Sequence, residues 1–122
     1  MGDRGEIVEI SIKTPIIFNG YLYEKAKIEI DHINYGLDKT TKELKKIKRS
    51  SFTLDDVMEF LEVLQDQFFL PKYSDGEREI YAIEVRCPIK EKSFGKLFRF
   101  VFSTATQYDK VISTITIFRI RD

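Results

Sequence analysis

Apolar and polar residues alternate through the first quarter of the chain, a pattern typical of half-buried β-strands. Residues 6–12 (EIVEISI) predict a short strand. In the next stretch, IIFNGYLY, apolar and aromatic residues flank Asn19-Gly20, a pair that favours the tight turn of a β-hairpin. Residues 25–33 predict a further strand, and its apolar face would carry Ala26, Ile28, Ile30 and His32.

Two helices are predicted in the middle of the chain, because the spacing of apolar residues changes there from two to three or four. Residues 38–50 (DKTTKELKKIKRS) place Leu44 and Ile47 one turn apart among lysines, which predicts a short, weakly amphipathic helix. Residues 53–70 predict a longer helix that begins at Thr53, a favourable N-cap followed by acids in the first turn. Its buried stripe would consist of Leu54, Val57, Met58, Leu61, Leu64 and Phe68.

Three more strands are predicted in the C-terminal third of the chain, at residues 79–87, 96–104 and 111–120. The links between them are short, which favours antiparallel pairing. Both faces of the last stretch, VISTITIFRI, are largely apolar, so this strand is expected at the centre of the sheet. The sequence therefore predicts a single α+β domain over residues 1–122. It would contain an N-terminal β-hairpin, then two helices packed on an antiparallel sheet that ends in a three-stranded meander.

The formal net charge is zero, with 20 basic and 20 acidic side chains, whereas most nucleic-acid-binding domains are clearly basic. The charges are unevenly distributed along the chain, however. Residues 51–80 contain eight acids and two bases, and residues 81–122 contain eight bases and four acids. A local basic face can therefore still attract an anion.

Cys87 is the only cysteine, so no internal disulfide can form, which suits a reducing compartment. The N-terminal stretch MGDRGEIVEI lacks the apolar region of a signal peptide. No apolar run approaches the roughly 18 residues that a membrane-spanning helix needs. We therefore expect a cytoplasmic protein with no membrane partner.

Most catalytic motifs are missing from the sequence. It has neither of the Gly-rich phosphate loops, GxxxxGKS/T and GxGxxG, nor the GxSxG motif of serine hydrolases. One histidine and one cysteine cannot build a standard zinc site, so no metal or cofactor is expected. Metal-independent RNA cleavage remains, because it needs only a general base, a general acid and cations around the phosphate.

The candidates for such a site are His32, the basic residues Lys45, Lys46, Lys48 and Arg49, and the group Arg99, Thr114, Thr116 and Arg119. Each also has an ordinary structural interpretation. A lone histidine at a strand end is often structural, and a lysine run usually forms a solvated helix face. Arg99 can pair with Glu84 across two neighbouring strands.

One succession of motifs is found within residues 27–121. It consists of His32, the stretch RSSFTLDDVMEFLE that starts at Arg49, and the strands GKLFRFVFS and VISTITIFRI. This succession resembles the small ribonuclease toxins of the barnase/colicin-D/RelE-like superfamily. The resemblance implies helices followed by a meander of antiparallel strands, with His32 as the acid/base and Arg49 on phosphate. It also implies that the scissile phosphate is lined by Arg99, Thr114 or Thr116, and Arg119.

Two main functional hypotheses follow from these features. The first is a metal-independent RNA-cleaving, toxin-like domain that acts on tRNA or mRNA through a His/Arg/Thr site. The alternative is a non-enzymatic protein-interaction module, with an antitoxin or immunity-type partner or a second copy of itself, which the balanced charge and the acidic helix favour. A third hypothesis is ligand binding under a curved sheet lined by Phe98, Phe100 and Phe102, which otherwise form ordinary core.

Overall fold

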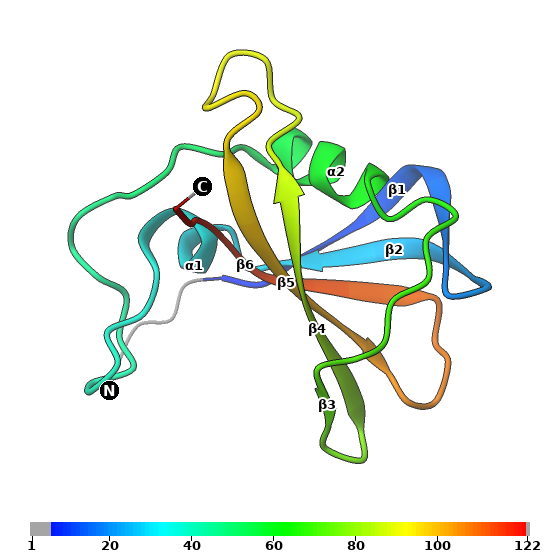
Figure 1. The fold of residues 1–122 in the computed structure, drawn as a ribbon. Coiled ribbons are helices and arrows are strands. Elements are labelled where there is room, and N and C mark those ends of the chain that lie inside the picture. Colours follow the sequence, from blue (N-terminus) through cyan, green and yellow to red (C-terminus); the bar gives the residue numbers. More distant parts are fainter. Residues whose placement is uncertain (1–5, 122) are drawn as a thin grey trace.

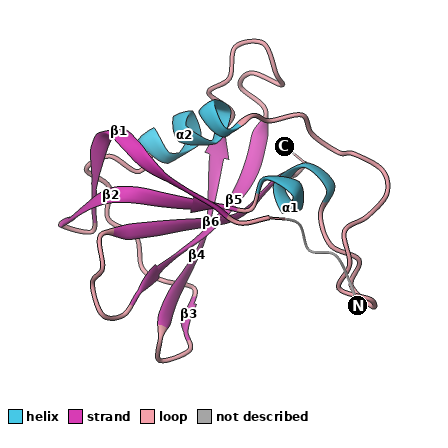
Figure 2. Ribbon diagram, turned by 180° about the vertical axis from the view of Figure 1, so that it is seen from behind, coloured by secondary structure: helices cyan, strands magenta, loops and turns pink. Residues whose placement is uncertain are grey.

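The computed structural model describes residues 6–121, which form one curled, six-stranded β-sheet and two short helices (Figure 1). The strands are β1 (Val8–Phe18), β2 (Tyr21–Ile28), β3 (Tyr73–Ser74), β4 (Arg78–Arg86), β5 (Leu97–Ala105) and β6 (Val111–Arg119). The helices are α1 (Ile30–Tyr35) and α2 (Leu54–Glu62), and Figure 2 shows how small a part of the chain they form. Neither of these described helices is long and apolar enough to span a membrane.

The strands are arranged in the order β1-β2-β6-β5-β4-β3. Neighbouring strands pair antiparallel, except that β2 and β6 are parallel. The hairpin turn at Asn19-Gly20 and the C-terminal meander are confirmed, and β6 lies at the centre of the sheet as predicted. β6 thereby joins the N-terminal hairpin to the meander in one continuous sheet.

The predicted fold class is nevertheless wrong. The sheet is mixed rather than antiparallel, and the two helices, with six and nine residues, are too short to form a helical layer on it. The parallel β2–β6 pair leaves no local signal in the sequence, because most of the chain separates its two strands. The short links between the last three strands predict that these strands pair antiparallel, but they say nothing about how the other strands pair.

Residues 38–50 form a loop rather than the predicted helix. The Asp38 carboxylate accepts hydrogen bonds from the backbone N–H groups of Thr40 (2.8 Å) and Thr41 (3.0 Å), which closes a tight turn where a helix would begin. Lys42 then has a φ of 62°, which a right-handed helix excludes. The lysine-rich segment lacks an apolar face broad enough to hold a helix against the sheet.

The strand predicted for residues 25–33 ends at Ile28, and the chain continues as helix α1. Alternation over so few residues also fits a turn of helix, and in the structure Ile33 takes the buried position. His32 therefore lies in a helix and not on the apolar face of a strand, which corrects its predicted placement.

Helix α2 begins at its predicted N-cap but ends at Glu62, well before the predicted end at residue 70. The Asn19 side chain holds the following segment against β1, because it bonds both backbone groups of Phe69 (2.8 and 3.0 Å). These tertiary bonds replace the helical ones. Phe68, which was expected in the buried stripe, is consequently 74% exposed.

The start of α2 carries a complete capping box. Thr53 Oγ1 accepts a hydrogen bond from the Asp56 backbone N–H (3.2 Å), and Asp56 Oδ2 accepts one from the Thr53 N–H (2.9 Å). We predict that Thr53→Ala lowers the free energy of unfolding by about 1 kcal/mol, because the Asp56 backbone N–H loses its acceptor. Urea denaturation of Thr53→Ala and of Thr53→Ser, which keeps the hydroxyl, tests this. Equal stability of the two variants would contradict it.

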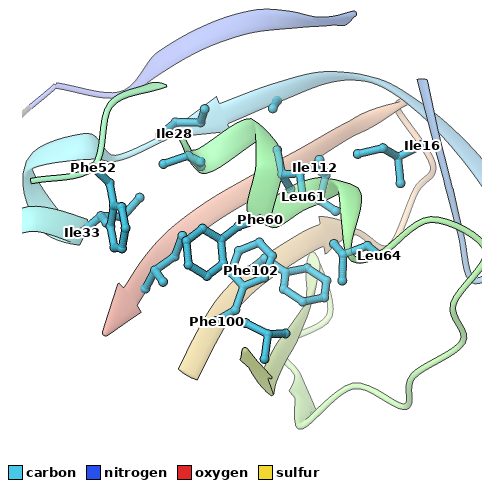
Figure 3. Close-up of a cluster of buried hydrophobic side chains, with 14 of the residues drawn as sticks. Ile16, Ile28, Ile33, Phe52, Phe60, Leu61, Leu64, Phe100, Phe102 and Ile112 are labelled. Carbon is cyan, nitrogen blue, oxygen red and sulfur yellow. The ribbon is translucent and has the colours of Figure 1, made fainter. Parts of the chain in front are cut away.

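The hydrophobic core lies between α2 and one face of the sheet (Figure 3). Phe60 of α2 packs edge-on against Phe98 and Phe100 of β5, with ring centroids 5.9 and 6.2 Å apart. Phe102 continues this row of buried rings, so all three inward phenylalanines predicted for β5 are core residues. The structure thus supports the interpretation of these three rings as ordinary core.

Candidate functional site

Three segments that are distant in the sequence meet where β4 and β6 end and β5 begins. They are residues 36–52, 87–96 and 119–121, and together they are called the cationic junction. Lys92 joins the first two segments, because its Nζ donates a hydrogen bond to the Ser51 carbonyl (2.7 Å). Arg49 joins the first segment to β6, because its Nη2 donates to Thr116 Oγ1 (2.7 Å). In Figure 1 the C-terminus accordingly lies beside α1 and the loop that follows it.

Arg49 also caps the C-terminal end of α1. Its Nη2 donates to the His32 carbonyl (3.0 Å) and its Nε donates to the Ile33 carbonyl (3.1 Å). These groups belong to the last turn of the helix, where a cation is favourable, and the His32 carbonyl also accepts the Gly36 N–H (2.8 Å). The guanidinium carbon lies 5.5 Å from the centre of the Phe118 ring, which adds a cation–π contact. Arg49 is therefore held rigidly between α1 and β6.

Gly36 leaves the room that the Arg49 guanidinium occupies. A Cβ atom at Gly36 would lie 2.7 Å from Arg49 Nη1, and the φ of 76° there disfavours any other residue. Partial burial lowers the pKa of the Arg49 guanidinium, but arginine stays charged near neutral pH. Nη1 donates no hydrogen bond to any residue in the described range, so its two N–H groups can serve a ligand.

Asn34 fixes the loop that carries Arg49. Its side chain accepts a hydrogen bond from the Phe52 N–H (2.8 Å) and donates one to the Phe52 carbonyl (2.9 Å). Its own carbonyl accepts hydrogen bonds from the backbone N–H groups of Arg49 (2.7 Å) and Ser50 (3.1 Å). Asn34 is buried, so these bonds have no competing water. The position of Arg49 therefore depends on an asparagine that the sequence did not single out.

A cavity of about 490 Å³ opens at the cationic junction. It is lined by Arg49, Lys92, Arg119, Ser50, Ser51, Ser93, Phe52, Glu91 and Phe98. Arg119 is exposed and forms no ion pair with any residue that the structure describes. The whole junction contains eleven of the 20 Lys and Arg residues and only three acids, Asp38, Glu43 and Glu91. Basic residues thus outnumber acids in the three segments that meet here, although the whole chain is neutral.

Lys92 forms an ion pair with Asp56, with Nζ and Oδ2 2.6 Å apart. Burial of Asp56 opposes its ionisation, but the hydrogen bonds from Lys92 and Thr53 and the charge of Lys92 outweigh this, so the pKa of Asp56 is lowered. A lowered pKa contributes stability above the ordinary carboxyl range, and this stability is lost as the pH falls through the folded-state pKa. The pair therefore stabilises the junction at neutral pH.

We predict that Lys92→Met lowers the free energy of unfolding at pH 7 by about 1 kcal/mol, because Asp56 loses its partner. The deficit should shrink as the pH falls below about 4, where the Asp56 carboxyl is protonated in the unfolded chain. Urea denaturation between pH 2 and pH 7 measures this, with Lys90→Met as the control at an exposed lysine. A deficit that is the same at every pH would contradict the ion-pair account.

The structure brings three of the residues implied by the ribonuclease resemblance together. Arg49 bonds Thr116, and Arg49 and Arg119 line the same cavity. Arg99 lies elsewhere, because it pairs across the sheet with Glu84, with Nη2 and Oε1 3.4 Å apart. It lines a separate hollow on the sheet, away from the junction.

His32 and Thr114 are enclosed side chains. The His32 side chain is 14% exposed, its Nδ1 lies 3.9 Å from Glu29 Oε1, and that nitrogen has no hydrogen-bond partner. Thr114 is 1% exposed and its Oγ1 also has none. Neither residue lines the cavity of the cationic junction. Arg49, Thr116 and Arg119 therefore lie together, whereas His32, Thr114 and Arg99 do not line the cavity beside them.

Sequence reasoning missed Asn34, Gly36 and Lys92. A glycine at position 36 is a weak signal, because a positive φ is a common reason for a glycine. Asn34 and Lys92 carry no local signal, because each acts on backbone or charge from a distant segment. Within residues 6–121 no group of three His, Cys, Asp or Glu residues could hold a metal ion.

Comparison with protein-family models, with curated proteins and with solved structures gives no significant match. The ribonuclease-toxin resemblance thus rests on this chain's own residues.

Proposed function

We propose that this chain binds RNA at the cationic junction, with Arg49 and Arg119 on a phosphate group. The observation that carries the proposal is the cavity between them, which combines two arginines and three serine hydroxyls with Lys92, which is paired with Asp56, and one acid, Glu91. Arginine and hydroxyl side chains are typical ligands of nucleic-acid phosphates. Arg49 is held in place before any ligand arrives, so little conformational entropy is lost when it binds.

The charge distribution supports a polyanion as the ligand. The neutral total argued against nucleic acid, but the fold gathers eleven basic residues in three segments with only three acids. Such a field attracts an extended chain of phosphates more strongly than a single small anion. The lysines of residues 39–48 would then contact phosphates that flank the one in the cavity.

The arrangement favours binding over cleavage. Cleavage would need a general base within hydrogen-bond reach of the ribose 2′-hydroxyl. His32 is the only histidine and does not line the cavity, and Glu91, the one carboxylate that does, is an exposed side chain. We therefore expect RNA to remain intact when it is incubated with the protein.

The proposal is tested by fluorescence anisotropy with a short single-stranded RNA at several salt concentrations. The logarithm of the association constant should fall linearly with the logarithm of the salt concentration. Arg119→Gln should reduce the magnitude of that slope by about 0.7, because one phosphate contact to a single strand is lost. Arg119 suits this test because it is exposed and makes no ion pair with another described residue.

The matched control is Lys25→Gln, which removes an exposed cation from β2, outside the junction. It should leave the slope unchanged. Equal effects of the two variants would overturn the proposed site. If the protein cleaves the RNA and His32→Ala abolishes this cleavage, the ribonuclease hypothesis replaces the binding proposal.

A second candidate function, capture of an extended peptide with basic side chains, is favoured by a cavity of about 420 Å³ between β1 and α2. β1 is an edge strand, and the cavity is lined by one lysine, Lys13, and by three acids that form no ion pair with another described residue: Asp55, Glu59 and Glu62. An added strand would pair with the β1 edge, and its cations would face these acids.

Titration calorimetry with a short lysine-rich peptide tests this second function. Glu59→Lys should weaken binding, whereas Glu77→Lys, in the distant β3–β4 turn, should not. Equal weakening by both variants would mean that only net charge matters.

A further inference from the structure

The opposite end of the sheet carries a small pocket built from tyrosines, where β4 begins and β5 ends. This tyrosine pocket has a volume of about 150 Å³. It is lined by Tyr21, Tyr23, Tyr81, Tyr108, Glu79, Asn19, Thr104, Ala105 and Thr106. Four of the six tyrosines of the chain are therefore gathered at one place, which neither the core nor the cationic junction explains.

Tyr108 forms one wall of the pocket together with the β1–β2 hairpin. Its ring centroid lies 4.9 Å from that of Tyr21, with the planes inclined by 41°, and 5.7 Å from that of Tyr23, inclined by 85°. The Tyr108 hydroxyl donates a hydrogen bond to the Leu22 carbonyl, which fixes the link between β5 and β6 against the hairpin. The three rings therefore stand at different inclinations around the space and do not form a flat stack.

The other wall of the pocket carries a carboxylate. The Tyr81 ring stacks on buried Phe102, with centroids 4.9 Å apart and planes 8° apart. The Tyr81 hydroxyl accepts a hydrogen bond from Asn19 Nδ2 (3.0 Å) and donates one to Glu79 Oε2 (3.4 Å). This chain of bonds holds the Glu79 carboxylate at the pocket.

The electrostatic character of the pocket is negative. Glu79 is the only charged residue among the described lining residues. Burial raises the pKa of Tyr23 to about 12, and the nearby charge of Asp109 adds to this. Phosphates and nucleotides are therefore unsuitable ligands, whereas a cation is attracted both by the carboxylate and by the ring faces.

We propose that the tyrosine pocket binds a compact quaternary ammonium group. Several aromatic rings and one carboxylate around such a group are the usual chemistry of its recognition. The volume suits one small head group, since pockets for drug-sized ligands measure roughly 300–1,000 Å³. A primary ammonium ion would need three hydrogen-bond acceptors, whereas a quaternary one needs none. The inference is independent of RNA binding, because it uses no residue of the cationic junction.

The first test is a proton NMR titration of the full chain with tetramethylammonium chloride. The methyl signal should move upfield on binding, because the methyl groups lie over aromatic rings. Choline should bind at least about tenfold more tightly than its neutral carbon isostere, 3,3-dimethylbutan-1-ol, since only choline has the cationic interaction. Equal affinity of choline and the isostere, or absence of tetramethylammonium binding, would overturn the proposal.

Variants locate the site. Tyr108→Leu should weaken tetramethylammonium binding roughly 3- to 30-fold, whereas Tyr108→Phe, which keeps the ring, should retain most of it. Tyr73→Leu, at an exposed tyrosine of β3 outside the pocket, is the control and should change nothing. Unchanged binding by folded Tyr108→Leu would exclude this pocket as the site.

A last comparison identifies the source of the ammonium group. Free choline and an acetylated trimethyllysine amide carry the same head group on different chains. Tighter binding of choline would indicate a small-molecule ligand, and tighter binding of the trimethyllysine derivative would indicate a modified protein. Either result supports the proposed chemistry.

Discussion

Asn34→Asp is expected to destabilise the protein by about 3 kcal/mol at pH 7. The substitution buries a carboxylate and leaves the Phe52 carbonyl beside it without a donor. The introduced carboxylate would still accept the Phe52 N–H, but it could not donate to the Phe52 carbonyl. The loop that carries Arg49 depends on the hydrogen bonds of Asn34, so the variant should lose both stability and RNA binding. Urea denaturation followed by circular dichroism measures the effect.

Asn19→Asp is the comparison variant, because Asn19 also bonds both backbone groups of Phe69 but is only half-buried. It loses its bonds to the Phe69 carbonyl and to the Tyr81 hydroxyl, which water can replace in part, so the expected cost is smaller than at Asn34. The two variants should also differ in their pH dependence. At position 34 the folded-state pKa of the introduced carboxyl lies above its unfolded value of about 3.9, so the protein regains stability as the pH falls. A small or pH-independent loss of stability for Asn34→Asp would contradict the claim that the Asn34 side chain forms two buried hydrogen bonds to Phe52.

Phe60→Ala is expected to lower the free energy of unfolding by about 3–5 kcal/mol. The Phe60 ring is fully buried and packs against Phe52, Phe98 and Phe100. Its removal leaves a cavity between α2 and β5 that neighbouring rigid rings cannot fill. Chemical denaturation gives the value directly.

Phe68→Ala is the matched control in the same stretch of sequence, and it should change stability by less than about 0.5 kcal/mol. Phe68 is 74% exposed, although a helix running to residue 70 would bury it. The two variants therefore distinguish a helix that ends at Glu62 from one that continues to residue 70. A large cost at Phe68 with a small cost at Phe60 would mean that the helix continues.

The features that the sequence predicted correctly are those with a local cause. Asn19-Gly20 supplies its own turn geometry, Thr53 and Asp56 close their own capping box, and Phe98 to Phe102 alternate along one strand. Each of these signals lies within a few residues of the structure that it determines, so no knowledge of the rest of the chain is needed.

The errors in the predicted fold have non-local causes. β2 lies parallel to β6 because both bury their apolar faces in the same core, and nothing near either strand records the partner. Helix α1 exists because Ile33 packs into that core while Arg49 caps the last turn from a distant loop. The lysines of residues 38–50 are compatible with a helix, but this segment makes too few apolar contacts to stabilise one.

The candidate site was predictable to a similar extent. Arg49, Thr116 and Arg119 were candidates from their chemistry, and the resemblance gave them roles; in the structure Arg49 bonds Thr116 and shares a cavity with Arg119. The expected role of His32 assumed that it lies at a strand end, whereas in the structure it lies in helix α1. The uneven distribution of charge indicated that a local basic face could form, but its position depends on three separate segments that meet only in the fold.

The most direct test of RNA binding at the cationic junction is an amide chemical-shift map of the protein, titrated with a short single-stranded RNA. The proposal predicts that the largest shift changes lie in residues 36–52, 87–96 and 119–121, and that the β1–α2 cavity and the tyrosine pocket are unaffected. Shift changes centred on either of those two other places, or their absence at low salt, would contradict it.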